Sequence, residues 1–378
     1  MKKEEFNRTS EFREQCASQI LAGVTQAKGQ SAFIGLDGFV DEIVHAVDKR
    51  QSATVYERLP TIASMAERVA AAAGKSTNIE LVNQRTKLGG NGPIMANALA
   101  SFGVGVAYLG ALGYPHLHPV FESFSEKAQV HSICEPGRTD AVEFLDGKVM
   151  MVKSVALNDI TWANIQARFG RDRFIENFSR ANLIGFVNWT MIPYMSDIWE
   201  SLLAEICPTL NGPRRRIFFD LADPAKRSGE DLLRALNIIS RFEQYFTVTL
   251  GLNEKEAAAV GAVLGIKMGA SSPENIGGMA SAMQTRLNIE TVVIHPVTYA
   301  VAASAGQFAC VPGPRIAKPV ITTGAGDHFN SGFCLGKLLG LSNAACLQSG
   351  VTTSGYYVRS GLSPSMENIA AMMRDWPE

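Results

Sequence analysis

The chain has little net charge and few charged residues. Of its 378 residues only 19% are charged, and 35 Lys and Arg against 36 Asp and Glu give a formal net charge of -1. A chain without a positive excess has no long-range attraction for nucleic acid or for an anionic membrane surface. Arg214-Arg215-Arg216 is the only tight basic run, and solvated positions before a strand explain it. We therefore expect no nucleic acid and no membrane as partners.

Cysteine pairs and long apolar runs are also missing. The six cysteines contain no CxxC pair and their spacing is irregular, so we expect neither a disulfide framework nor structural zinc. His116 and His118 have the spacing of metal ligands, but no carboxylate or thiol accompanies them. No run approaches the 18 apolar residues of a membrane span, and Met1 to Phe6 are unlike a secretory signal. These features predict a cytoplasmic protein.

Two common phosphate-binding signatures are absent as well. The chain contains no GxxxxGK[ST] loop, which excludes a Walker-type kinase. No GxGxxG follows the first apolar run, which argues against a dinucleotide-dependent dehydrogenase.

What is present is an alternation of two apolar patterns. Short apolar runs typical of buried strands alternate with stretches of helical spacing, and 46% of the residues are hydrophobic. This alternation predicts a parallel sheet covered by helices on both faces. The strand-like runs are 31–36, 104–109, 181–187, 216–220, 245–250, 291–295 and 318–321. The helical stretches include 8–28, 92–102, 196–206, 231–242 and 253–264.

One segment breaks this alternation. Residues 141–152 alternate in polarity around Asp146-Gly147, a dipeptide typical of a two-residue hairpin turn. A hairpin among βα units must lie at the edge of the main sheet or outside it. We expect it to form a small separate sheet with 40–47 and 78–82, whereas most of 50–85 fits no clear pattern.

The strongest chemical signal is Thr322-Thr323-Gly324-Ala325-Gly326-Asp327, between a strand-like run and a helix from about Asp327. Small residues leave their N–H groups accessible at the positive end of that helix, which stabilises an anion such as phosphate. A carboxylate there suits an acid-base role: Asp327 would take a proton from an attacking hydroxyl while the amides hold the transferring phosphoryl group. The alternative is a Gly-rich turn with Asp as a helix cap.

This motif, with Phe329 and Ser331-Gly332-Phe333 after it, resembles the signature of the ribokinase-like (PfkB) carbohydrate kinases. Gly35–Asp41, Gly89-Gly90 and Asn253–Glu256 resemble further family landmarks in the family's order, so the resemblance spans about 31–375. It implies a ribokinase-like three-layer α/β/α sandwich with a mainly parallel central sheet and a small β-sheet lid. The expected boundaries are a single domain 1–378, lid segments at about 39–50, 78–88 and 130–155, and an N-terminal helical extension 1–30.

The resemblance also implies a reaction, the Mg²⁺-dependent transfer of a phosphoryl group from ATP to a sugar hydroxyl. Asp327 would be the base, and Gly324, Ala325 and Gly326 would form the anion hole. The residues implied to contact the sugar are Asp41, Asp37, Gly89, Gly90 and Asn91. Those implied to contact the nucleotide are Asn253, Thr322, Thr323 and His295. Glu256 and Asn253 would hold Mg²⁺, although a helix capping box explains the same pair locally.

Several positions depart from the family's pattern. Ile321 replaces an Asp that helps several members bind a monovalent cation, so we expect no such site. Ile94 replaces a sugar-contacting Asn, a contact that Asn91 could supply, and the loop that begins at His295 lacks the usual glycines.

These departures leave two alternatives open: an adenosine-like nucleoside kinase of the same fold, or a sugar- or nucleotide-binding relative without turnover. Phe39 and Trp189 are the only hints of an aromatic pocket for a nucleoside. Unpaired strands at the edge of the lid make a homodimer through the lid plausible.

Overall fold

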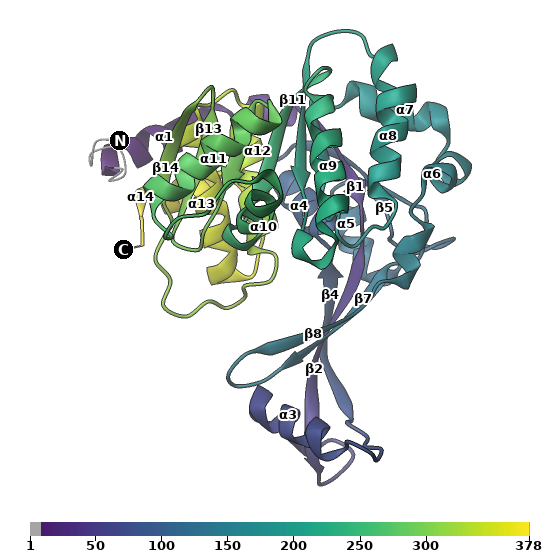
Figure 1. Cartoon of the computed structure of the whole chain (residues 1–378). Helices are drawn as coiled ribbons and strands as arrows, with labels where there is room; N and C mark the ends of the chain where they lie inside the picture. Colours follow the sequence, from purple (N-terminus) through teal and green to yellow (C-terminus); the bar gives the residue numbers. More distant parts are fainter. Residues whose placement is uncertain (1–8, 378) are drawn as a thin grey trace.

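The structure is a computed structural model and describes residues 9–377 (Figure 1). Its main sheet has nine strands in the order β14-β13-β12-β11-β10-β9-β1-β5-β6. The strands from β12 to β6 in this order are parallel, while β13 and β14 add an antiparallel edge. The strands are β1 (Ser31–Leu36), β5 (Gly105–Gly110), β6 (Gln129–Ser132), β9 (Leu183–Phe186), β10 (Arg215–Asp220), β11 (Phe246–Leu252), β12 (Thr291–Ile294), β13 (Tyr299–Ser304) and β14 (Gln307–Pro312). The mainly parallel sheet is confirmed.

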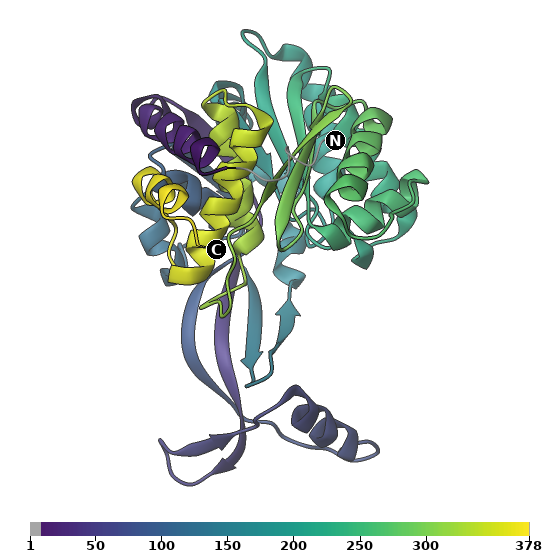
Figure 2. The same cartoon turned by 90° about the vertical axis from the view of Figure 1, so that its left-hand side faces the viewer.

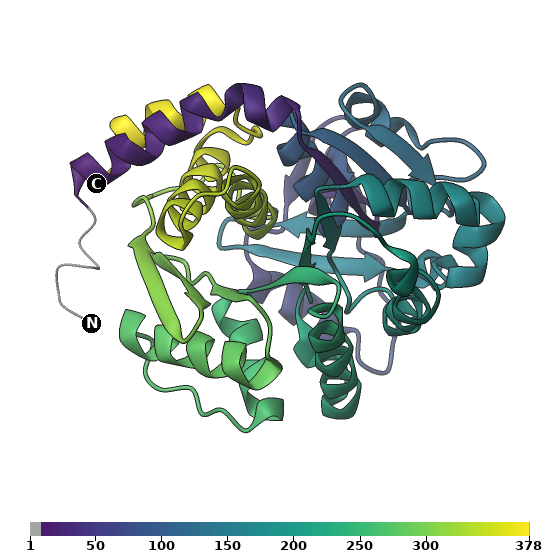
Figure 3. The ribbon, with the colours of Figure 1, turned by 90° about the horizontal axis from the view of Figure 1, so that it is seen from above.

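Helices cover both faces of this sheet (Figure 3). One face carries α6 (Trp162–Arg168), α7 (Arg171–Arg180), α8 (Met195–Glu205), α9 (Gly229–Phe242), α10 (Glu254–Leu264) and α11 (Pro273–Leu287). The other carries α1 (Ser10–Ala22), α2 (Val24–Lys28), α4 (Asn91–Ser101), α5 (Glu122–Ser125), α12 (Ala325–Leu338), α13 (Asn343–Ser360) and α14 (Met366–Arg374). Successive strand residues serve opposite faces: Phe219 packs into the first core and Phe218 into the second.

A second, five-stranded sheet projects from the body and forms the lid (Figures 1 and 2). Its strands are β2 (Phe39–Arg50), β3 (Tyr56–Arg58), β4 (Leu81–Gly89), β7 (Gly137–Glu143) and β8 (Lys148–Lys153). The predicted hairpin is confirmed, since β7 and β8 pair antiparallel around Asp146-Gly147. The predicted lid segment 130–155 is too long, because Val130 to Ser132 pair with β5 in the main sheet.

The segment that fitted no pattern belongs to the lid. It contains β3 and α3 (Ile62–Ala71), which covers the far end of the lid sheet. Met65 of α3 packs with Val44, Leu59 and Phe144 in a hydrophobic cluster separate from the two cores of the body. The Ile62 N–H also donates a 3.0 Å hydrogen bond to Asp146 Oδ1 at the hairpin turn. The lid therefore has a core of its own.

Two predicted elements differ in the structure. The predicted helix 8–28 is broken at Gly23 into α1 and α2, and residues 1–8 of the expected N-terminal extension lie outside the described residues. The predicted strand 318–321 is irregular. Its Val320 N–H donates a 2.8 Å hydrogen bond to the carbonyl of Val358 near the end of α13, so this segment meets a helix end rather than a sheet edge. Within residues 9–377, no helix combines the length and apolarity that crossing a membrane requires.

Candidate active site

The segment from Thr322 to Asp327 lies between two cavities at the carboxyl ends of the parallel strands. The first, called here the lid cavity, has a volume of about 320 Å³ and lies between the lid and the body. The second, the apolar cavity, has a volume of about 510 Å³. Thr323, Gly324 and Asp327 line the lid cavity, whereas Thr322, Ala325 and Gly326 line the apolar cavity. A group held at this segment is therefore accessible to molecules in both cavities.

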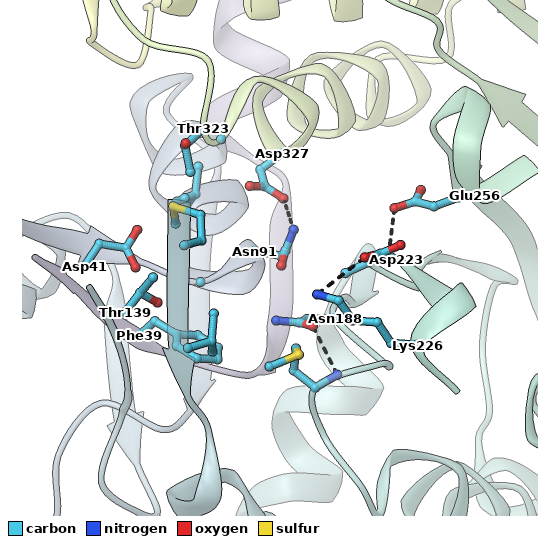
Figure 4. Close-up of a pocket in the computed structure, with 17 residues that line it drawn as sticks. Phe39, Asp41, Asn91, Thr139, Asn188, Asp223, Lys226, Glu256, Thr323 and Asp327 are labelled. Atoms are coloured by element: carbon cyan, nitrogen blue, oxygen red, sulfur yellow. Dashed lines mark hydrogen bonds and ion pairs between the residues drawn. The ribbon is translucent and has the colours of Figure 1, made fainter. Parts of the chain in front are cut away.

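Asp327 enters the lid cavity from the first turn of α12 (Figure 4). Its Oδ1 accepts a 2.8 Å hydrogen bond from Nδ2 of Asn91, the first residue of α4. Burial, and secondarily the nearby carboxylate of Asp220, raises the pKa of Asp327 well above its ordinary value. A carboxylate with a raised pKa and a single side-chain donor is suited to accept a proton. Asn91, which we expect to contact a sugar, lines the same cavity and also contacts this carboxylate.

The backbone around Gly324 is shaped for an anion. Gly324 is the N-cap of α12 and has φ +93°, a left-handed conformation that favours glycine. The Ala325 N–H donates a 3.1 Å hydrogen bond to the carbonyl of Thr322. Because this N–H already has an acceptor, Ala325 contributes less than expected to an anion hole. Gly326 and Asp327 lie in the first helical turn, where backbone N–H groups have no intrahelical acceptor. These two N–H groups are the candidate anion donors.

The lid contributes Phe39, Asp41 and Thr139 to the opposite wall of the lid cavity (Figure 4). Burial raises the pKa of Asp41, while Lys87, whose Nζ lies 3.9 Å from Asp41 Oδ2, acts in the opposite direction. A Cβ atom on Gly89 would lie 2.4 Å from Cγ of Asp41. Gly89 itself does not line the cavity; its missing side chain makes room for the Asp41 carboxylate.

Asp37 lies behind the cavity wall rather than in it. Its carboxylate accepts hydrogen bonds from the backbone N–H groups of Asn91 at 2.9 Å and Gly92 at 2.8 Å, and from Asn188 Nδ2 at 2.7 Å. Complete burial raises the pKa of Asp37 to about 6. Because both carboxylate oxygens are occupied, Asp37 positions the start of α4, where Gly90 and Asn91 reach the cavity.

Glu256 and Asn253 form a capping box at the start of α10. The Asn253 N–H donates to Glu256 Oε2 at 2.8 Å, and the Glu256 N–H donates to Asn253 Oδ1 at 2.9 Å. Glu256 Oε1 also accepts the Asp223 N–H at 2.9 Å. Glu256 faces the lid cavity and Asn253 the apolar cavity. Each oxygen keeps a second lone pair, so capping leaves both side chains able to face a cation.

The apolar cavity has the chemistry of a slot for a flat ring. Its walls are mainly apolar and include Pro296, Val297, Tyr299, Pro314, Ile316, Pro319, Val351 and Val358. His295, which we expect to contact a nucleotide, lines this cavity, and the centroid of its ring lies 4.5 Å from that of Phe329. Burial lowers the pKa of His295 to about 4, so its ring is neutral near pH 7.

Sequence reasoning missed several polar residues at the lid cavity, among them Thr139 and Asp223, which line it. Lys148 of β8 donates a 2.7 Å hydrogen bond from Nζ to Thr323 Oγ1, which joins the lid to the 322–327 segment. Asn188 and Lys226 line the cavity from the body. Lys148 directly follows the Asp146-Gly147 turn, and this position at the hairpin was the one available signal.

Comparisons with known proteins agree with this architecture. The profile of the family described as "Khk: Prokaryotic ketohexokinase" matches residues 7–376. A ketohexokinase from Haloferax volcanii is 31% identical over 345 residues, which cover 91% of this chain and 90% of the relative.

Solved structures share the fold at lower identity. An Arabidopsis thaliana ribokinase complexed with ribose and ATP superposes with a TM-score of 0.62 at 15% identity, covering 91% of this chain and 98% of that one. A nucleoside kinase from Methanocaldococcus jannaschii gives 0.60 at 13% identity, covering 92% and 98%. The expected ribokinase-like fold is confirmed, but the fold alone does not separate sugar from nucleoside substrates.

The buried Asp327 predicts a pH-dependent stability difference. Because burial raises its pKa in the folded state, the wild type loses stability as pH rises above the ordinary Asp pKa of about 4. Asp327→Asn removes the titration and keeps the side chain's shape, so its Tm should exceed that of the wild type by about 2 °C or more near neutral pH. Thermal unfolding between about pH 4 and pH 8 measures this, and the gap should narrow toward the acidic end.

The same substitution at the exposed Asp159 is the control and should show no such pH-dependent gap. Two results would show that ionised Asp327 does not destabilise the folded protein. One is an Asp327→Asn variant with a lower Tm than the wild type at neutral pH, and the other is a Tm difference that does not change with pH.

Proposed function

Because this chain belongs to the prokaryotic ketohexokinase family and is an ATP-dependent carbohydrate kinase, we propose that it phosphorylates a ketohexose bound in the lid cavity. One observation carries the proposal: a single segment, Thr322 to Asp327, lines both cavities. In the proposal, the sugar hydroxyl approaches from the lid cavity and the triphosphate from the apolar cavity. The phosphoryl group crosses at the start of α12, where the helix end stabilises its charge.

Asp327 is the proposed base. It takes the proton from the attacking hydroxyl, and Asn91 holds the carboxylate in place through the 2.8 Å hydrogen bond. A raised pKa favours this role because a base whose pKa lies nearer the working pH accepts a proton more readily. The N–H groups of Gly326 and Asp327 face the charge that develops on the phosphoryl oxygens.

Lys148 is the proposed cation of the lid. Its hydrogen bond to Thr323 places a positive charge beside the segment that holds the phosphoryl group, where it offsets negative charge during transfer. The lid also restricts access of water to the reacting groups, and water is a competing acceptor for the phosphoryl group. Lys148 therefore couples the position of the lid to the chemistry.

The residues that line the apolar cavity provide the proposed nucleotide site. The base would lie between the apolar walls, with neutral His295 beside it. Thr322 and Asn253 lie nearer the phosphates in this arrangement, and Thr323 faces the acceptor side.

Mg²⁺ fits the oxygen donors at the start of α10. Among the described residues, no three His, Cys, Asp or Glu side chains form a metal cage, but Mg²⁺ typically binds one or two carboxylates together with phosphates and water. Glu256 and Asn253 are hard oxygen donors that face the two cavities, and we propose that they hold the ion through water. When bound, the ion neutralises phosphate charge and orients the phosphates.

A ketohexose fits the lid cavity better than a nucleoside. Among residues 9–377, Phe39 is the only aromatic side chain that lines it, so a purine would find no second ring from this part of the chain to stack against. Trp189, the other aromatic hint in the sequence, is fully buried away from the cavity. Asp41, Thr139 and Asn188 offer the polar groups that sugar hydroxyls need, and the Haloferax relative is named a ketohexokinase. The retained base and capping pair argue against a relative without turnover.

The lid edge is the proposed contact between two copies of the chain. Strand β8 lies at one end of the lid sheet, and Met151, Val152 and Val155 on or next to it are exposed. An apolar edge strand pairs readily with another strand.

Sedimentation velocity should therefore report twice the mass of the 40.8 kDa chain, and Val152→Lys should shift the protein to monomer. A monomeric wild type would contradict this contact.

A substrate screen tests the function directly. With MgATP present, ADP release should be fastest with ketohexoses, D-fructose among them, and slower by about tenfold or more with aldohexoses, pentoses and nucleosides. The panel should be repeated with Asp41→Asn as a control: turnover of the preferred sugar should fall through a raised KM. Preference for a nucleoside would support the other substrate class, and a uniformly inactive panel would contradict the kinase assignment.

A further inference from the structure

A third cavity lies beside the lid cavity, on the far side of Ile94, whose side chain lines both. We call it the cationic cavity. It has a volume of about 580 Å³ and is bounded by β4 of the lid on one side and by α4, α5, α12 and the end of α13 on the other. Figure 2 shows the C-terminal helices, in yellow, above the base of the lid strands. The cavity therefore lies where the lid joins the body.

Three basic side chains line this cavity. They are Arg85, Lys87 and Lys127, and no Asp or Glu between residues 9 and 377 lines the cavity. Among the described residues, the side chains of Arg85 and Lys127 have no hydrogen-bond or ion-pair partner. Lys87 has only the 3.9 Å contact with Asp41, which reaches it from the lid cavity, and its side chain is 13% exposed. Arg85 and Lys127 are exposed to solvent at this cavity, and a cluster of Lys and Arg donors of this kind can bind an anion.

The pKa of Lys87 agrees with this picture. Burial lowers the pKa of Lys87, Asp41 and more weakly Asp327 raise it, and the neighbouring charges of Lys148 and Arg85 lower it. A bound anion would offset both the cost of burying the charged Lys87 side chain and its repulsion by Lys148 and Arg85.

The wall of the cavity is hydrogen-bonded to the proposed anion hole. Asn97 Nδ2 donates to Ser363 Oγ at 3.1 Å, and Ser363 Oγ lies 2.9 Å from His328 Nε2. His328 Nδ1 lies 2.8 Å from the carbonyl of Gly324, so Nδ1 carries the proton and donates it. Tyr357 stacks on His328 with ring centroids 3.6 Å apart, and its hydroxyl donates to the carbonyl of Thr323 at 2.9 Å.

We propose that the cationic cavity binds a small phosphomonoester, whose dianionic phosphate is held by Arg85, Lys87 and Lys127. Phosphate dianions are matched by several Lys and Arg donors, and the volume leaves room for an organic group beyond the phosphate. The ligand is thus distinct from the nucleotide, which the apolar cavity is proposed to take.

The positions of the cations assign an effect to this ligand. Arg85 and Lys87 lie on the lid strand β4, whereas Lys127 follows α5 in the body. Without an anion, these like charges repel the lid from the body. A bound phosphate bridges them and holds the lid edge against the body, next to Asp41 and the lid cavity. The phosphomonoester should therefore lower the KM for the sugar, and by reciprocity the sugar should tighten binding of the phosphomonoester.

Only this effect on KM rests on the proposed function; binding itself is measured without turnover. Isothermal titration calorimetry of the full chain should use three probes, namely inorganic phosphate, D-fructose 1-phosphate and sn-glycerol 3-phosphate. We expect binding by at least one phosphomonoester with a Kd below about 10 mM. The double variant Arg85→Ala/Lys127→Ala should weaken it by about tenfold or more. Circular dichroism spectra of this variant and of the wild type should coincide, which checks that the variant is folded.

The matched control is Lys49→Ala/Lys75→Ala, which removes the same charge from exposed positions of the lid outside the cavity and should bind as the wild type does. In assays with the preferred sugar, the bound probe should lower KM by about twofold or more in the wild type and in this control. It should have no effect in Arg85→Ala/Lys127→Ala.

Tighter binding of inorganic phosphate than of either ester would identify a free phosphate site rather than an ester site and would overturn the assignment of the ligand. Absence of binding, or equal binding by both double variants, would overturn the site. Displacement of the probe by the sugar or by a non-hydrolysable ATP analogue would place it in the active site instead. Binding without a change in KM would overturn the bridging of lid and body.

Discussion

The hydrogen bond between Asn91 and Asp327 is the contact on which the rest of the site depends. It joins the first residue of α4 to the first turn of α12 at 2.8 Å. Asp37 holds the start of α4 from behind, and Gly324 opens the start of α12 toward the lid cavity. Two helix N-termini thus converge on one carboxylate. Their combined positive ends stabilise negative charge where the phosphoryl group is proposed to pass.

This arrangement concentrates buried acid. Burial raises the pKa of Asp327, and the charges of Asp220 and Glu256 raise it further. Burial, and secondarily Glu256, raises the pKa of Asp220 to about 8. Such a cluster lowers the stability of the empty protein, because the hydrogen bonds to these carboxylates only partly offset their lost hydration and their mutual repulsion. A cation and the donors around a phosphate would relieve the penalty. The folded protein is thus less stable because it buries the carboxylate that the proposed reaction needs as a base.

Much of this was predictable from sequence because it rests on local signals. The Gly-rich motif before α12, the Asn253–Glu256 pair and the Asp146-Gly147 turn each involve neighbours in the chain, and the structure places them in the expected elements. The prediction of a strand at 318–321 was wrong because this segment contacts the end of α13. That contact joins residues about 40 positions apart, and the periodicity of the sequence does not encode it.

Side-chain roles set by distant contacts were harder to predict. Asp37 directly follows β1, whereas Asp41 lies in β2, where it pairs with Lys87 of β4 and occupies the space left by the missing side chain of Gly89. Only this pairing places Asp41 at the lid cavity. Lys148 gains its place from Thr323, 175 positions along the chain. Residues of β4, α5 and α13 together line the cationic cavity, so no single stretch of sequence predicts it.

The central claim is that Asp327 takes the proton from the sugar hydroxyl during transfer. The most direct measurement is single-turnover rapid quench with excess enzyme, labelled ATP and saturating sugar, comparing Asp327→Asn with the wild type. We expect the rate of sugar phosphate formation to fall by at least about 10²-fold in Asp327→Asn while the Kd values of both substrates change little. A rate close to that of the wild type would contradict it.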